Sequence, residues 1–476
     1  MPASIQDFAE QRRALAHDAH RPSYHFVAPA HWMNDPNGVI QWGGRFHLFY
    51  QHNPLSAEFG LMHWGHAISQ DLIHWSDLPT ALTPTPDSPD ERGCWSGCSV
   101  DNGGVPTLVY TGVRGARYEV QTQCLATSSD DLITWEKYTG NPVLSEIPAE
   151  SKQNYDFRDP YVWREGESWY LVLASRIVGV GGAAFLYRSP DLIHWEYLHP
   201  LLVGSIEKTG SVWECPSFFP LGDKWVLVVA GKGAGIPVTV FYFVGEYVNQ
   251  RFTPESEGVL DHGYFYAPYT MRDDLSRRLL WGWLREGRGE AAHSAAGWAG
   301  AHAIPRVLSL RDDHLHMEPV PELIGLRGTQ ADFADIRLEG EDVALDVEGL
   351  ALDITTEFEP AGTVGIALTC APDGSEQTRI TYDPAAQRLT VNRERSSLGS
   401  GNETFPTEAS HALAPGEPLR LRILLDGSLL EVIADGRTSL CSRIYPSRAD
   451  SRGIRLFGQG KVGTMTIWQM RSIWAE

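Results

Sequence analysis

A seven-residue segment occurs three times in the chain, and its spacing constrains the fold more than any other feature of the sequence. Residues 69–75 read SQDLIHW, residues 129–135 read SDDLITW and residues 189–195 read SPDLIHW. The aspartates at the third position, Asp71, Asp131 and Asp191, are 60 residues apart in both steps. Self-similarity at a fixed period of this length is typical of proteins built from repeated supersecondary units. The sequence therefore predicts a repeat architecture.

Runs of aromatic and β-branched residues accompany the repeats and continue beyond them. Each run contains a leucine, at positions 48, 108, 171, 227 and 280, so that successive runs are 60, 63, 56 and 53 residues apart. Five such units, rich in strand formers and turns and without long helical periodicity, predict a five-bladed β-propeller. A tandem of β-sandwiches would also produce repeats. In a propeller the first strands of the blades line a central funnel, so residues distant in sequence can meet in one pocket.

The character of the sequence changes after about Pro321. Residues 321–335 carry no repeat motif and are interpreted as a connector. Period-2 alternation follows in several later runs, and Asp-Gly pairs at 426–427 and 435–436 are typical of hairpin turns. These features predict an all-β second domain, most simply a β-sandwich. We expect a catalytic propeller domain over residues 1–325 and a C-terminal sandwich domain over residues 326–476.

Composition excludes several classes of partner. The chain has 39 Lys and Arg against 60 Asp and Glu, a formal charge of −21, which disfavours nucleic acid and anionic membranes. No run of about 20 apolar residues exists to span a bilayer. The first thirty residues carry charges throughout and resemble no signal peptide, so a cytoplasmic protein is expected. The six cysteines lack metal-site spacing and are interpreted as reduced thiols.

Three acidic residues stand in settings that suit glycosidic bond cleavage, which needs one protonated carboxyl group and one ionised carboxylate. Asp35 precedes Pro36 in a segment of turn-forming residues just before the first blade. Asp159 follows Arg158, whose charge is expected to keep that carboxylate ionised. Glu214 lies between Trp213 and Cys215, where loss of solvent is expected to raise its pKa, as a general acid requires. Each residue also has a purely structural interpretation. Asp35 would form an Asx turn, Asp159 would form an ion pair, and Glu214 would face solvent from a blade edge.

Taken together, the segments around these residues resemble glycoside hydrolase family 32, the invertase and fructanase family. Residues 32–38 (WMNDPNG), 157–160 (FRDP) and 213–216 (WECP) match the family's three signatures in order and spacing. The segments WGHAIS at 64–69 and IPR at 304–306 are also similar. The resemblance extends over nearly the whole chain, and the fold it implies is again a five-bladed propeller followed by a β-sandwich.

The resemblance implies a role for each site residue. Asp35 would be the nucleophile, Glu214 the acid/base and Asp159 the transition-state stabiliser. Substrate would be held by Asn34, Gln51, Trp95, Ser96 and Arg158. The implied reaction releases terminal β-fructosyl units from sucrose or fructo-oligosaccharides, with neither metal nor cofactor. A fructosyltransferase, an exo-fructanase that prefers levan or inulin, and a non-catalytic carbohydrate-binding propeller are the alternatives. Oligomeric state is left open.

The sequence departs from the family pattern at four named residues, and an Asp expected before residues 265–267 (FYA) is missing. Phe59 stands where Trp is usual, Cys98 where Ser is usual and Tyr269 where Gln is common, and Gly287 replaces an aromatic residue. These departures are expected to shape substrate subsites and not the carboxylate chemistry. The glycine-rich segment at 231–235 lacks phosphate-binding spacing and is interpreted as a turn.

Overall fold

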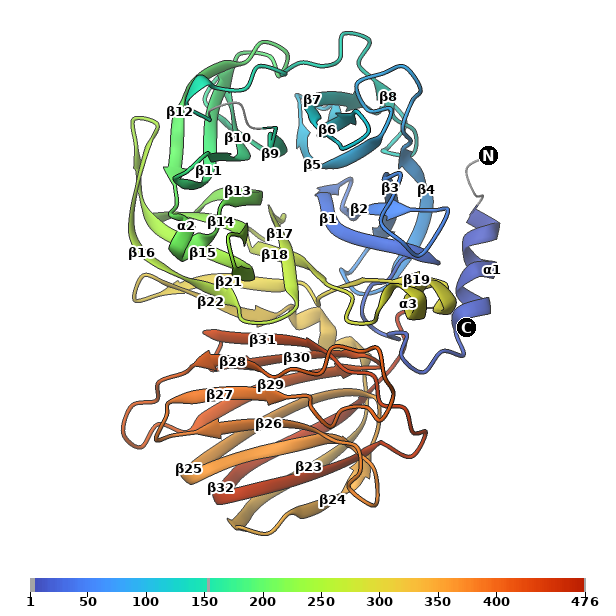
Figure 1. Cartoon of the computed structure of the whole chain (residues 1–476), viewed down its shortest axis with the longest axis vertical. Coiled ribbons are helices and arrows are strands. Elements are labelled where there is room, and N and C mark those ends of the chain that lie inside the picture. Colours follow the sequence, from blue (N-terminus) through green and yellow to red (C-terminus); the bar gives the residue numbers. More distant parts are fainter. Residues whose placement is uncertain (1–4, 152–154, 475–476) are drawn as a thin grey trace.

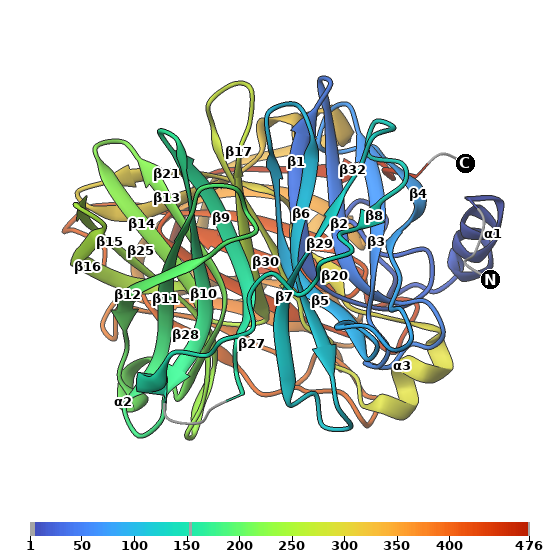
Figure 2. The ribbon, with the colours of Figure 1, turned by 90° about the horizontal axis from the view of Figure 1, so that it is seen from above.

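The computed structural model describes residues 5–151 and 155–474 and shows two stacked β units. Five sheets are arranged around a common axis, and a second unit packs against one side of them (Figure 1). Seen from above, the propeller lies in front of the second unit, whose strands appear in orange and red (Figure 2). The predicted five-bladed propeller followed by a sandwich is confirmed, and the tandem of sandwiches is wrong.

Each blade contains four strands that follow one another in the sheet in sequence order. Blade one comprises β1 (His31–Trp42), β2 (Arg45–Asn53), β3 (His63–Ser69) and β4 (Trp75–Leu82). Blade two comprises β5 (Gly93–Asp101), β6 (Pro106–Arg114), β7 (Val120–Thr127) and β8 (Glu136–Lys137). Blade three comprises β9 (Arg158–Glu165), β10 (Ser168–Ile177), β11 (Gly181–Ser189) and β12 (Glu196–Val203). Blade four comprises β13 (Val212–Leu221), β14 (Lys224–Gly233), β15 (Ile236–Val248) and β16 (Arg251–Asp261).

Blade five comprises β17 (Phe265–Arg272), β18 (Arg278–Leu284), β21 (Arg306–Arg311) and β22 (His314–Pro319), and β20 (Ala301–His302) pairs with β18. The short strand β19 (Trp298–Ala299) adds to blade one beside β1 and so joins the end of the ring to its start. The helical segments are α1 (Ile5–Leu15), η1 (Ala149–Ser151), α2 (Ile206–Thr209), α3 (Glu290–Ala296) and η2 (Pro321–Leu326). None of the helices in the described part of the chain is long and apolar enough to cross a membrane.

The two sequence periodicities mark equivalent places in the blades. The five leucines of the strand-like runs lie on the second strands β2, β6, β10, β14 and β18, and all are fully buried. The repeated heptapeptide is the turn that joins the third strand to the fourth. In its first copy the Asp71 carboxylate accepts the backbone N–H groups of Ile73 (3.0 Å) and His74 (2.8 Å). The indole of Trp75 donates to the carbonyl of Leu72 (3.1 Å), and the side chains of both residues are buried.

The innermost strand of every blade has a register shift at the same level. The shifts surround Asp35, Ser96, Asp159, Cys215 and Ala267, each of which is followed by proline or, in blade two, glycine. A bulge leaves a residue outside the hydrogen-bond ladder, so proline is tolerated there and the neighbouring side chains are redirected. Asp35 therefore lies inside β1, and its predicted place in a turn before blade one is wrong.

The second unit is a two-layered, nearly closed sheet assembly with its own apolar core. Its strands are β23 (Arg327–Glu339), β24 (Val343–Glu348), β25 (Ala351–Cys370), β26 (Thr378–Asp383), β27 (Arg388–Asn392), β28 (Thr407–Ser410), β29 (Leu419–Asp426), β30 (Leu429–Ala434), β31 (Thr438–Arg443) and β32 (Gly453–Met470). Both Asp-Gly pairs form hairpin turns, as predicted. The connector expected over 321–335 is wrong beyond Leu326, because β23 pairs with β32. Most β23 side chains are exposed, which removes the hydrophobic alternation that indicates a strand.

A buried group of four ionic side chains joins the two units, and we call His25, Arg306, Asp426 and Glu431 the interface cluster. His25 Nδ1 is 3.0 Å from Asp426 Oδ2, and His25 Nε2 is 3.0 Å from Glu431 Oε1. Arg306 of blade five donates to Glu431 Oε2 of the sandwich at 2.5 Å. Each of the four side chains is at most 1% exposed. The cluster fixes the propeller and the N-terminal segment to the sandwich.

Candidate active site

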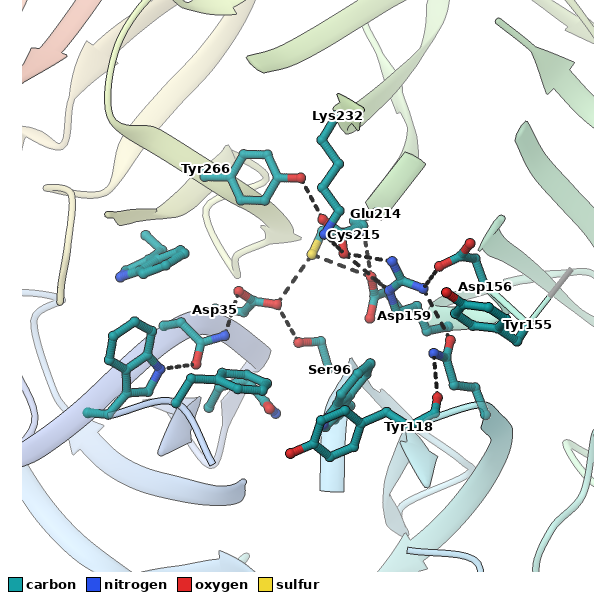
Figure 3. A pocket seen from close by; sticks show the side chains of 18 of the residues that line it. Asp35, Ser96, Tyr118, Tyr155, Asp156, Asp159, Glu214, Cys215, Lys232 and Tyr266 are labelled. Atoms are coloured by element: carbon teal, nitrogen blue, oxygen red, sulfur yellow. Dashed lines mark hydrogen bonds and ion pairs between the residues drawn. The ribbon is translucent and has the colours of Figure 1, made fainter. Parts of the chain in front are cut away.

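The bulges of the inner strands converge on one open pocket of about 300 Å³. All eight predicted site residues line it: Asn34, Asp35, Gln51, Trp95, Ser96, Arg158, Asp159, Glu214. The other lining residues are Trp32, Phe59, Arg117, Tyr118, Gln121, Tyr155, Asp156, Cys215, Lys232, Tyr266 and Trp283. The side chains of Asp35, Asp159 and Glu214 come from blades one, three and four and point toward the same space (Figure 3).

Asp35 is held by donors on both carboxylate oxygens. Ser96 Oγ donates to Asp35 Oδ2 at 2.5 Å, and Asn34 Nδ2 donates to Oδ1 at 3.0 Å. The Cys215 thiol lies 3.4 Å from Oδ2. Burial raises the pKa of Asp35 above its ordinary value, and the Glu214 charge adds to the rise, while the Ser96 and Asn34 hydrogen bonds oppose it. The geometry fixes one orientation of the carboxylate and leaves it close to a second negative charge.

Glu214 has three donors. Arg158 Nη2 lies 2.7 Å and Lys232 Nζ 2.8 Å from Oε1, and the Tyr266 hydroxyl donates to Oε2 at 2.5 Å. Burial alone would raise the pKa of Glu214, but the charges of Arg158 and Lys232 outweigh it and lower the pKa to about 2. The predicted rise is therefore wrong for the pocket as it stands, because two cations, not apolar neighbours, surround this carboxylate.

Asp159 has the opposite environment. Burial raises its pKa to about 7, and the charges of Glu214 and Asp35 add to the rise. Arg158 opposes it, but the Arg158 Nε is 3.9 Å from Asp159 Oδ2, whereas its Nη2 is 2.7 Å from Glu214. The prediction that Arg158 keeps Asp159 ionised is wrong, because the guanidinium pairs with the next blade. The backbone N–H of Cys215 donates to Asp159 Oδ2 at 2.9 Å and fixes its position.

The predicted sugar-binding residues lie around these carboxylates. Gln51 is buried, and its amide donates to the carbonyl of Cys94 at 2.9 Å. The buried Trp95 Nε1 has no acceptor among the described residues. The rings of Trp32, Phe59 and Trp95 lie side by side on one wall of the pocket. The centroid of the Phe59 ring is 6.3 Å from that of Trp32 and 6.2 Å from that of Trp95. An apolar wall beside hydrogen-bonding groups suits a sugar, which has both CH faces and hydroxyl groups.

The sequence analysis missed two residues that donate hydrogen bonds to Glu214, namely Lys232 and Tyr266. The turn predicted over residues 231–235 is confirmed only for residues 234 and 235, because β14 continues to Gly233 and so contains Lys232. Its side chain nevertheless reaches the pocket. Tyr266 precedes the bulge residue of blade five, as Glu214 precedes that of blade four. An alignment of the bulges in the sequence would have placed it in the pocket.

The family departures have less effect on the pocket than expected. Phe59 lines it, but Cys98 and Tyr269 are buried and do not. Gly287 packs near Arg443 and Tyr445 of the sandwich, so it belongs to the contact between the two units. The expectation that all four shape substrate subsites is wrong for these three, because none of them lines the pocket. No group of three or more His, Cys, Asp or Glu side chains in residues 5–151 and 155–474 is arranged to hold a metal ion.

Comparisons with known proteins cover nearly the whole chain. Residues 25–319 match the model of the glycosyl hydrolases family 32 N-terminal domain, and residues 322–469 match that of the family 32 C-terminal domain. A sucrose-6-phosphate hydrolase of Zymomonas mobilis is 35% identical over 92% of this chain and 89% of its own length. A raffinose invertase of Escherichia coli is 36% identical over 94% of this chain and 95% of its own. Fructan 1-exohydrolase IIa of Cichorium intybus superposes with a TM-score of 0.87 at 28% identity, over 95% of this chain and 98% of that one.

Proposed function

The chain belongs to glycoside hydrolase family 32 and is a β-fructofuranosidase, and from this premise we propose how its residues divide the reaction. Asp35 is the nucleophile, Glu214 the acid/base and Asp159 the stabiliser of the transition state. The observation that supports this assignment is the convergence of the three carboxyl groups from separate blades on one pocket. We place the boundary between catalytic and sandwich domains at residues 325 and 326, at the end of η2.

The reaction proceeds in two displacements. An Asp35 oxygen attacks the fructosyl anomeric carbon while the bond to the leaving-group oxygen breaks and Glu214 gives that oxygen its proton. Water then attacks the covalent intermediate, Glu214 takes a proton from the water, and the bond to Asp35 breaks. Two inversions give net retention. This chemistry requires carboxyl groups about 5–5.5 Å apart.

The neighbouring side chains serve these steps. Ser96 and Asn34 orient Asp35, whose hydrogen-bonded carboxylate is ready for attack. Asp159 is positioned to accept fructosyl hydroxyl groups, and its charge would stabilise the oxocarbenium-like transition state. Gln51, Trp95 and Arg158 complete the fructosyl site.

We propose sucrose and short fructo-oligosaccharides as substrates, with terminal fructosyl units released one at a time. Transfer to a sugar acceptor in place of water, and hydrolysis with a preference for levan or inulin, are alternatives that the pocket residues do not favour. The cytoplasmic location and the lack of nucleic-acid and membrane partners stay predictions.

The proposal is tested by measuring fructose release from sucrose, raffinose, inulin and levan in parallel, with the initial anomer identified by NMR. We expect release of β-fructose from sucrose and raffinose, and its loss in Asp35→Asn and Glu214→Gln. Normal turnover in either variant, or an inverted product, would refute the roles. Trisaccharides formed at high sucrose concentration would indicate a transferase.

A further inference from the structure

The guanidinium group of Arg158 is held from two opposite sides. Its Nη2 and Nε lie 2.7 and 3.2 Å from Glu214 Oε1. Its Nη1 donates to Asp156 Oδ1 at 2.7 Å and to Gln121 Oε1 at 3.1 Å. Asp156 and Glu214 lie on opposite sides of this group (Figure 3). Because a guanidinium group is planar and rigid, the contacts of Nη1 also fix the direction in which Nη2 and Nε point.

Asp156 is itself fixed by contacts within blade three. Its Oδ2 lies 2.9 Å from Arg176 Nε, and its backbone carbonyl accepts the hydroxyl of Ser175 at 2.6 Å. Arg176 and Ser175 both lie on β10. The Asp156 side chain is 12% exposed, against 7% for Arg158 and 29% for Arg176. Asp156 therefore has a place that is set by the blade, and it joins a buried cation to one nearer the solvent.

Asp159 is adjacent to Arg158 in sequence, but its backbone directs its carboxylate elsewhere. Asp159 has a φ of +61°, in the left-handed region that few residues other than glycine adopt. Its N–H donates to Thr111 Oγ1 at 2.9 Å, and its Oδ2 accepts the backbone N–H of Cys215 at 2.9 Å. These contacts leave Asp159 Oδ2 3.9 Å from Arg158 Nε. A shift of about 1 Å would bring the two atoms within hydrogen-bond distance.

The position of Arg158 decides how the two neighbouring acids differ. Burial alone would raise the pKa of Glu214, but the charges of Arg158 and Lys232 lower it to about 2. Burial raises the pKa of Asp159 to about 7, and Arg158 opposes this rise only in part. Transfer of the guanidinium group from Glu214 to Asp159 would therefore raise the first pKa and lower the second. The pocket would lose the separation of pKa values by which paired carboxyl groups take different roles.

We propose that Asp156 is a positioning residue of the reaction and acts through Arg158. It holds the guanidinium group on Glu214 and away from Asp159. The inference rests on the proposed roles of these two acids. Without the charge of Asp156, the neutral amide of Gln121 would be the remaining partner of Nη1 among the described residues, and the guanidinium group would be free to turn toward Asp159. The other charged or titratable groups that face the two acids are Asp35, Cys215, Lys232 and Tyr266.

The test measures the titration of both acids in Asp156→Asn. Carbon-13 NMR of protein with labelled Asp or Glu carboxyl groups follows each titration, and Glu214→Gln and Asp159→Asn assign the two signals. In the wild type, Glu214 should stay ionised down to about pH 3 and Asp159 should titrate near pH 7. In the variant we expect Glu214 to titrate above about pH 3 and Asp159 to titrate well below its wild-type value. Loss of the Asp156 charge alone would instead lower both pKa values, because a neighbouring negative charge is removed.

Turnover of sucrose gives the second measurement. In Asp156→Asn we expect kcat/KM to fall about 10-fold or more, the size expected when a charge-assisted hydrogen bond no longer holds its partner in place. Glu196→Gln, which removes a carboxylate of the same blade from a surface pair with Arg188, is the matched control and should change neither the titrations nor turnover. Asp156→Ser, whose smaller side chain leaves room for water beside Arg158, replaces Asp156→Asn if that variant does not fold.

Two results would overturn the inference. The first is that the pKa values of Glu214 and Asp159 fall together or stay unchanged, and the second is that they move in opposite directions while turnover of sucrose stays intact. The titrations need no substrate, so they are independent of the proposed function. If the wild type released no fructose but the two pKa values still moved in opposite directions in Asp156→Asn, the proposed function would be refuted and the hold of Asp156 on Arg158 would stand.

Discussion

Two buried ionic groups differ in how their charges are balanced. In the interface cluster, two carboxylates meet two cations, and His25 lies between both acids. In the pocket, we call Asp35, Asp159, Glu214, Arg158 and Lys232 the pocket cluster. Both of its cations contact the same oxygen of Glu214, so one carboxylate is compensated twice and the other two much less.

The pKa values follow this difference. In the interface cluster, hydrogen bonds to Asp426 and Glu431 overcome burial and raise the pKa of His25 to about 9, while Arg306 and His25 lower that of Glu431 to about 2. Both groups are thereby held in their charged forms. In the pocket cluster, burial raises the pKa of Asp159 to about 7 and also raises that of Asp35. Balanced pairs of this kind hold domains together, whereas unbalanced carboxylates in an open pocket are typical of catalytic sites.

The largest expected effect separates activity from stability. Asp35→Asn should lower fructose release by about 10³- to 10⁵-fold, because an amide is not a nucleophile for this step. It should leave the free energy of unfolding unchanged or slightly higher, since a poorly compensated charge is removed. Steady-state kinetics and urea denaturation measure the two quantities. Loss of several kcal/mol of stability would show that Asp35 is a structural anion.

The second prediction exchanges a carboxylate for an amide in each cluster. Glu431→Gln should destabilise the protein by about 3–5 kcal/mol, because it leaves Arg306 without its buried partner. Asp159→Asn should instead stabilise the protein at pH 8. At that pH the wild-type carboxylate is ionised, although burial and the neighbouring carboxylates disfavour its charge. Denaturation of both variants at pH 8 measures the contrast, and Glu255→Gln in a surface pair should cost less than about 1 kcal/mol. Changes of the same sign in both clusters would contradict the comparison.

The fold was largely predictable from the sequence, because the three repeated turns depend on local hydrogen bonds accepted by Asp71, Asp130 and Asp191, and they recur at about the blade period. Convergence of Asp35, Asp159 and Glu214 followed from the same repeat together with the family signatures. The ion pairs were not predictable. Arg158 is adjacent to Asp159 in sequence but binds Glu214 of the next blade, and such contacts depend on how blades pack. The same applies to the interface cluster, whose members are up to 406 residues apart.

The third prediction concerns the pH dependence of stability. The pKa of His25 is about 9 in the folded protein and about 6.5 in an unfolded chain, so its contribution is complete below pH 6.5 and is lost as the pH rises through 9. Stability should fall by about 3 kcal/mol across this range. Urea denaturation at pH 6.5, 8 and 9 measures it, and His25→Gln should flatten the slope. A wild-type profile as flat as that of His25→Gln would mean that His25 is neutral in its pair.

The smallest expected effect lies in the pocket cluster. Ser96→Ala removes the 2.5 Å donor to Asp35 Oδ2, one of the hydrogen bonds that hold the pKa of that carboxyl down. The acid limb of kcat/KM should therefore move to higher pH, because Asp35 must be ionised to attack. The loss near the limb should be about 3- to 10-fold, and Asn34 limits it by keeping its own hydrogen bond. Ser99→Ala, on the same strand but donating to the carbonyl of Gly38, should leave the limb in place. An unmoved limb in Ser96→Ala would mean that another group, with Asp159 the first candidate, controls activity at low pH, and the division of charge within the pocket cluster would have to be reassigned.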